Sequence, residues 1–74
     1  MELDKVKELL AGLMSRDISQ IDENTDFRTL GMDSLDLLHL IVEAEAYFNI
    51  TIPEPTLPTL RTVGDLVGIL RGKD

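Results

Sequence analysis

Ser34 is the side chain whose type and position best suit chemistry in this 74-residue sequence. It lies at the start of a predicted helix, because Asp33 is a favourable N-cap and Asp36 holds the reciprocal position of a capping box. The stretch Gly-Met-Asp-Ser-Leu is not a G-x-S-x-G nucleophile elbow. The only histidine, His39, follows five residues later and about 140° around the helix, so it cannot serve Ser34 as a base. Catalysis by this chain alone is therefore not expected.

One chemical role for Ser34 remains, namely to carry a phosphoester. A serine at a helix N-terminus presents its hydroxyl beside backbone N–H groups that have no partner in the helix. These groups and the positive end of the helix dipole favour a phosphate on the serine oxygen. We therefore expect Ser34 to be modified by another enzyme.

A metal site is the competing interpretation of the acidic residues that precede Ser34. Asp22, Asn24 and Asp26 occupy positions 1, 3 and 5 of an EF-hand-like run. Phe27 then stands where the turn needs glycine, and Asp33 stands where a bidentate glutamate is needed. The chain also has no cysteine, which excludes a disulfide framework and a thiolate metal site. No metal site is expected.

Three helices are predicted to position the serine, and the first covers about residues 3–15. Its apolar residues recur at helical spacing: Leu3, Val6, Leu9, Leu10, Leu13 and Met14. A polar loop over residues 16–33 follows, and a loop of this length in so small a domain tends to be functional. Four apolar side chains are expected to attach the loop to the core: Ile18, Ile21, Phe27 and Leu30.

The second predicted helix runs from Asp33-Ser34 to Phe48 and has two apolar faces. The core face comprises Leu37, Leu40, Ile41, Ala44, Tyr47 and Phe48. We call the opposite face the second stripe; it comprises Leu35, Leu38, Val42 and Ala46. A small domain needs one buried face per helix, so the second stripe packs against the loop or the proline-rich segment, docks another protein, or does both. Three acids flank it: Asp36, Glu43 and Glu45.

The last helix is predicted to begin at a second capping box, Thr62 with Asp65, and to end at Gly72. Gly64 and Gly68 should each cost it up to about 1 kcal/mol relative to alanine. Three prolines between residues 53 and 58 leave room for at most one helical turn, near 55–60. The expected fold is all-α, an antiparallel bundle of three main helices in one domain over residues 1–74.

The net charge of −7 is concentrated in the middle of the chain. Residues 17–54 contain nine acids and Arg28 as the only base, a local charge of −8, whereas the flanking segments are nearly neutral. Such acidity argues against binding nucleic acid or an anionic membrane. No apolar run approaches the roughly 20 residues of a membrane span. Basic protein partners, steered towards Ser34, are expected.

The stretch Leu-Gly-Met-Asp-Ser-Leu-Asp at residues 30–36 resembles the acyl carrier protein family. The similarity extends through Glu43, Phe48, Ile50, Ile52-Pro53 and the closing Thr62-Val63-Gly64-Asp65-Leu66, and so covers nearly the whole chain. Length, acidity and helix order agree with it. The Asp-Ser-Leu core at the start of an acidic amphipathic helix is a specific signal.

The resemblance implies that Ser34 carries 4′-phosphopantetheine, transferred from coenzyme A by a phosphopantetheinyl transferase. The arm's thiol then holds an acyl group as a thioester, so the chain is a carrier and not an enzyme. Asp33 and Leu35 neighbour the arm by this resemblance. The implied docking residues for partner enzymes with basic patches are Asp36, Leu38, Val42, Glu43 and Glu45. An interior that shelters an acyl chain in some carriers maps to Leu40, Ala44 and Phe48.

Departures from the family pattern bear on the pathway. Relatives in fatty acid synthesis usually have acids where His39, Ala46 and Tyr47 stand here, which favours a specialised lipid or polyketide pathway over housekeeping fatty acid synthesis. Asp33 favours an acyl over a peptidyl carrier and leaves an aminoacyl or D-alanyl cargo open. A different class is an acidic helical adaptor with no prosthetic group. A monomer in the cytoplasm is expected.

Overall fold

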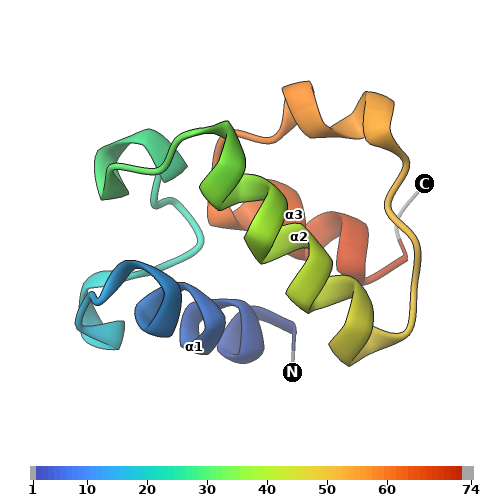
Figure 1. Cartoon of the computed structure of the whole chain (residues 1–74). Helices are drawn as coiled ribbons and strands as arrows, with labels where there is room; N and C mark the ends of the chain where they lie inside the picture. Colours follow the sequence, from blue (N-terminus) through green and yellow to red (C-terminus); the bar gives the residue numbers. More distant parts are fainter. Residues whose placement is uncertain (1, 73–74) are drawn as a thin grey trace.

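The computed structural model describes residues 2–72. The predicted domain covers residues 1–74, so its first residue and its last two lie outside the described part. The main helices are α1 (Glu2–Met14), α2 (Ser34–Phe48) and α3 (Val63–Leu70). Three short 3₁₀ helices join them: η1 (Ile18–Gln20), η2 (Phe27–Leu30) and η3 (Glu54–Thr59). In Figure 1, α2 runs diagonally across the front of α3, with α1 beside both. The all-α prediction is confirmed.

The core forms where α1 packs against both α2 and α3. Its side chains are Val6, Leu10, Leu40, Ile41, Ala44, Val63, Leu66, Val67 and Leu70 from the helices and Ile21, Phe27, Leu30, Met32, Ile52 and Leu60 from the connections. Ile21, Phe27 and Leu30 therefore attach the long loop to the core as predicted. No helix among residues 2–72 is long and apolar enough to cross a membrane.

Three residues predicted to be buried are exposed instead. Leu13, near the end of α1, is 36% exposed, and Ile18, the first residue of η1, is 44% exposed. Tyr47 is 60% exposed; its ring lies under the ammonium of Lys5, 4.2 Å from the centroid, and meets Phe48 edge to face. A cation–π contact at the surface has replaced core burial for this tyrosine.

Backbone hydrogen bonds attach the long loop to the segment that enters α3, which we call the loop–α3 pairing. The N–H of Phe27 donates to the carbonyl of Arg61 (2.9 Å), and the N–H of Val63 donates to that of Thr25 (3.0 Å). The N–H of Gly64 donates to the carbonyl of Glu23 (2.8 Å). The loop is therefore ordered by residues almost forty positions away in the sequence.

The proline-rich segment forms a longer helix than the sequence indicated. Instead of at most one turn near residues 55–60, η3 spans six residues, about two turns of a 3₁₀ helix. Pro55 lies in the first turn of η3, where the backbone N–H needs no partner within the helix. Pro58 lies three residues later, inside the helix. The N–H groups that must donate belong to other residues: Thr56 donates to Pro53 (3.0 Å) and Leu60 donates to Leu57 (3.1 Å).

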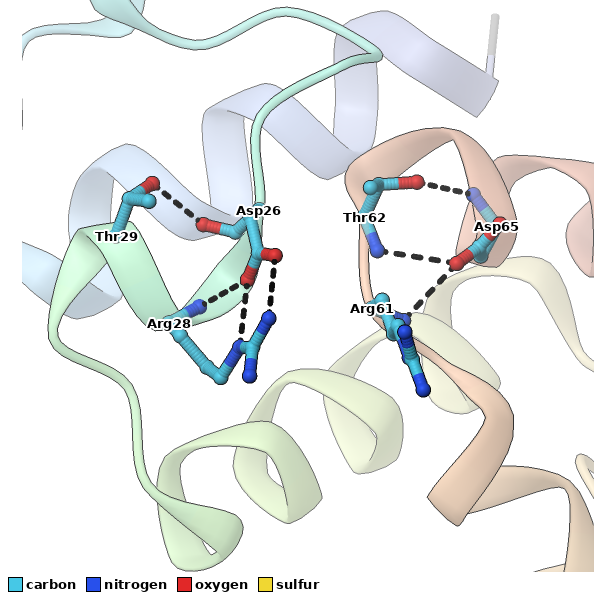
Figure 2. A network of polar contacts seen from close by, with 6 residues as sticks. All are labelled: Asp26, Arg28, Thr29, Arg61, Thr62 and Asp65. Carbon is cyan, nitrogen blue, oxygen red and sulfur yellow. Dashed lines mark hydrogen bonds and ion pairs between the residues drawn. The ribbon is translucent and has the colours of Figure 1, made fainter.

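Both predicted capping boxes are present, and the one at α3 is shown in Figure 2. One carboxylate oxygen of Asp65 accepts the N–H groups of Arg61 (2.9 Å) and Thr62 (3.1 Å). These hydrogen bonds to the ionised form lower the pKa of Asp65.

Replacing Asp65 by asparagine should lower the melting midpoint by roughly 2–5 °C at pH 7 and by much less at pH 3. Since the pKa of Asp65 is depressed by folding, its contribution is complete above the ordinary value of about 4 and is lost as the pH falls through the folded value. Melting curves of both proteins from pH 7 to pH 3 measure this. Parallel midpoint curves over that range would contradict it.

Candidate functional site

Ser34 is the first residue of α2 and its side chain is exposed. The capping box frames it: the N–H of Asp36 donates to Oδ1 of Asp33 (2.9 Å), and the N–H of Asp33 donates to Oδ2 of Asp36 (3.3 Å). Within residues 2–72, the hydroxyl of Ser34 and the N–H groups of Ser34 and Leu35 have no hydrogen-bond partner. A free hydroxyl thus lies beside two free N–H donors.

The chain that leads to Ser34 is held on both sides of a glycine turn. Leu30 is buried, and its carbonyl accepts the guanidinium of Arg16 (3.2 Å). Gly31 has φ +82°, a conformation that favours glycine, and Met32 is buried directly after it. The pattern Leu-Gly-Met-Asp-Ser therefore consists of an anchor, a turn, a second anchor, a cap and the exposed hydroxyl.

Ser34 borders two connected hollows between η2, the start of α2 and η3. The first, which we call the Ser34 groove, has a volume of about 360 Å³. Its lining residues are Asp26, Phe27, Arg28, Met32, Asp33, Ser34, Leu37, Pro58, Leu60 and Arg61. The second, of about 330 Å³, is lined by Ser34, Leu37, Leu38, Leu57, Pro58 and Leu60. Ser34 therefore lies beside an apolar wall, and two arginines and two aspartates line the same groove.

The sequence analysis missed the two arginines and the η3 wall of this groove. Arg61 reaches it through the loop–α3 pairing, which is not visible as a sequence pattern. A signal for Arg28 existed, because it is the only base between residues 17 and 54.

Arg28 is bound by Asp26, as Figure 2 shows. The guanidinium donates from Nε to Oδ1 (3.3 Å) and from Nη2 to Oδ2 (3.2 Å), and the N–H of Arg28 donates to Oδ1 (2.8 Å). The guanidinium and then the N–H lower the pKa of Asp26, and the carboxylate in turn raises the pKa of Arg28. The two charges largely neutralise each other at the groove.

The second stripe is exposed. Leu35 is 62%, Leu38 45% and Val42 53% exposed, and Ala46 is exposed as well. The alternative in which this stripe packs against the loop or the proline-rich segment is therefore wrong for Leu35 and Val42. Leu38 borders the hollow beside η3 and keeps nearly half of its surface free.

The three acids beside the second stripe differ in their surroundings. Glu43 is exposed. Asp36 is half-buried and caps α2. Glu45 is also half-buried, and its Oε2 accepts the N–H of Ile52 (2.6 Å), which ties the chain after α2 to that helix. Glu45 therefore has a structural task that the sequence did not reveal.

The side chains expected to line an interior shelter are not brought together around one cavity. Leu40 and Ala44 are fully buried and Phe48 is partly buried. Leu40 borders a hollow between α1 and α2, and Phe48 borders another near the start of α1. The hollows that reach Ser34 lie nearer the start of α2, at Leu37.

The aspartates of the EF-hand-like run bind within the loop. Oδ1 of Asp22 accepts the N–H of Asn24 (2.9 Å) and the hydroxyl of Thr25 (3.2 Å), and Asp26 binds Arg28. Residues 2–72 contain no group of three histidine, aspartate or glutamate side chains placed to hold a metal ion.

Comparison with known proteins gives one consistent similarity. The family described as "Phosphopantetheine attachment site" matches residues 4–70. An acyl carrier protein of Aster yellows witches'-broom phytoplasma is 46% identical over 68 residues, 90% of each chain. That of Chlamydia caviae is 39% identical over 69 residues, 92% of this chain and 90% of its own. The crystal structure of an acyl carrier protein from Thermotoga maritima aligns with a TM-score of 0.83 at 31% identity, over 99% of this chain and 91% of that one.

Proposed function

Since the chain belongs to the acyl carrier protein family, whose members carry phosphopantetheine and are not enzymes, we propose that Ser34 holds the 4′-phosphopantetheine arm. The observation that carries this proposal is the free Ser34 hydroxyl at the first residue of α2, beside two free N–H groups. A phosphoester on this oxygen gains hydrogen bonds from both groups and the favourable end of the helix dipole. The arm, when attached, supplies a thiol that forms thioesters with acyl groups.

The test is the intact mass of the protein after incubation with coenzyme A and a broad-specificity phosphopantetheinyl transferase. One addition of about 340 Da, the mass of the arm, is expected. Fragmentation should place the added mass on a peptide that contains Ser34. Absence of any addition with several transferases would support the alternative, an acidic helical adaptor without a prosthetic group.

We assign partner docking to the exposed part of α2 that follows Ser34. Leu35, Leu38 and Val42 offer an apolar strip, and Asp36 and Glu43 offer negative charge at its edge. Apolar residues surrounded by charge are typical of protein-binding surfaces. Basic patches on loading, transferring and condensing enzymes are the complementary partners. Glu45 contributes its charge to the same surface while it binds Ile52.

Replacing Leu38 by alanine or Glu43 by lysine should slow transfer to or from a partner enzyme by about 10-fold. Leu38→Ala removes apolar contact area, and Glu43→Lys turns electrostatic attraction to a basic partner into repulsion. Both variants should keep the fold, because both side chains are exposed. Steady-state rates with varied carrier concentration and melting curves measure the two effects.

The matched control for Glu43→Lys is Glu23→Lys, the same charge change at an exposed position in the long loop. Its transfer rate should remain near that of the unmodified sequence. Normal transfer by both α2 variants, or equal slowing in the control, would show that α2 is not the docking surface.

The cargo we propose is an acyl group of fatty acid, polyketide or specialised lipid biosynthesis. His39, Ala46 and Tyr47 are exposed on α2, so this surface is less acidic than the family pattern for fatty acid synthesis, which favours a specialised pathway. An aminoacyl or D-alanyl cargo is the alternative. Comparing which acyl- or amino-acid-activating enzymes load the phosphopantetheine-bearing form distinguishes them. We propose a cytoplasmic location, since a cysteine-free chain fits a reducing compartment. We also propose that the protein is a monomer.

A further inference from the structure

Two arginines, Arg28 and Arg61, line the groove that Ser34 borders. Arg28 is the only base between residues 17 and 54. The hydrogen bond from the N–H of Phe27 to the carbonyl of Arg61 (2.9 Å) brings Arg28 and Arg61 to the same place. Both side chains line the Ser34 groove. Two aspartates, Asp26 and Asp33, line the groove as well, so whether an anion can bind there depends on which arginine has a free guanidinium.

The two arginines differ in their availability. Arg28 is bound by Asp26 through two contacts of 3.2 and 3.3 Å. Within residues 2–72, the guanidinium of Arg61 donates no hydrogen bond, because Asp65 accepts only its backbone N–H. Figure 2 shows the Arg61 side chain extended away from the carboxylate of Asp65. Arg61 is therefore the cation of the groove that is available to a ligand.

We propose that Arg61 binds the phosphodiester formed on Ser34, so that the root of the arm is held at the Ser34 groove; this rests on the proposed attachment at Ser34. A phosphodiester keeps one negative charge at neutral pH, and the planar guanidinium matches two phosphate oxygens. The free N–H groups of Ser34 and Leu35 complete the donor set from the other side. A guanidinium and two backbone N–H groups would thus share one anion.

The contact also sets the direction in which the arm leaves the protein. With its phosphate held between the start of α2 and Arg61, the arm continues along the apolar wall made by Leu37, Pro58 and Leu60. The branched dimethyl carbon that follows the phosphate in pantetheine is apolar and suits this wall. Arg61 is therefore a positioning residue for the arm rather than a docking residue for partners.

The experiment compares unloaded and loaded forms of the unmodified sequence, Arg61→Gln and Lys7→Gln. Lys7 lies on α1, does not line the groove, and serves as the control for loss of one positive charge. At low salt, loading should raise the melting midpoint of the unmodified sequence and of Lys7→Gln by about 2–4 °C more than it raises that of Arg61→Gln. The difference should shrink in about 0.5 M salt, because a partly exposed ion pair is screened.

A second measurement needs no variant, namely the guanidinium N–H resonances of the unmodified sequence by NMR. Loading should move the Arg61 signal and leave that of Arg71, which pairs with Glu2, in place. Intact mass shows first whether the chain carries the arm. Failure of the attachment at Ser34 can therefore be told apart from failure of the Arg61 contact. A chain that never gains the arm overturns both. A loaded chain with an unmoved Arg61 signal, and with equal midpoint shifts in all three proteins, overturns the arginine contact alone.

Discussion

Replacing Ser34 by alanine should abolish attachment of the arm while the protein remains folded. Alanine has no oxygen on which a phosphoester could form, so the addition of about 340 Da should disappear completely. The fold should survive because the Ser34 side chain is exposed and the N-cap bonds of α2 come from Asp33 and Asp36. We expect a melting midpoint within about 4 °C of the unmodified sequence, since exposed substitutions away from caps cost at most about 0.5 kcal/mol.

Ser19→Ala is the matched control for this prediction. Ser19 is also an exposed serine that follows an acidic cap, because its N–H (3.0 Å) and hydroxyl (2.9 Å) both donate to Asp17. Ser19 does not line the Ser34 groove. The Ser19→Ala variant should therefore accept the arm on Ser34 at an unchanged rate. Continued mass addition to Ser34→Ala would place the attachment on another hydroxyl and overturn the proposed function.

The elements around Ser34 were predictable because their signals are local. A capping box spans four residues and an amphipathic helix repeats every three or four, so α2 and the start of α3 could be read from short windows. Both boxes are present in the structure. The errors occurred at the edges of apolar faces. Tyr47 satisfies the periodicity of α2 but is exposed over Lys5, a contact that depends on α1.

The groove beside Ser34 was not predictable for the opposite reason. It exists because residues 23–27 pair with residues 61–64, and neither segment contains a pattern that names the other. The same pairing explains why the polar loop is ordered, although the sequence indicated only its apolar anchors. Ser34 and its cap Asp33 could therefore be predicted from the sequence, whereas the position of Arg61 and of η3 beside them depends on the tertiary structure.

Replacing Gly64 by alanine should destabilise the protein, although alanine is the better helix former. A Cβ at Gly64 would lie 2.9 Å from the carbonyl oxygen of Glu23, the atom that accepts the N–H of Gly64 (2.8 Å). Because this atom belongs to the backbone, relief of the clash requires a shift of the loop–α3 pairing. Overpacking costs about 1–3 kcal/mol, which outweighs the gain in helix propensity of up to about 1 kcal/mol.

Gly68 supplies the matched control in the same helix, and the two substitutions should act in opposite directions. A Cβ at Gly68 meets nothing within 4 Å, so Gly68→Ala keeps the propensity gain and should raise the midpoint by up to about 4–8 °C. Gly64→Ala should lower it by roughly 5–10 °C. Thermal unfolding of both variants measures this. If Gly64→Ala is as stable as Gly68→Ala, close approach of the loop is not the reason for glycine at residue 64.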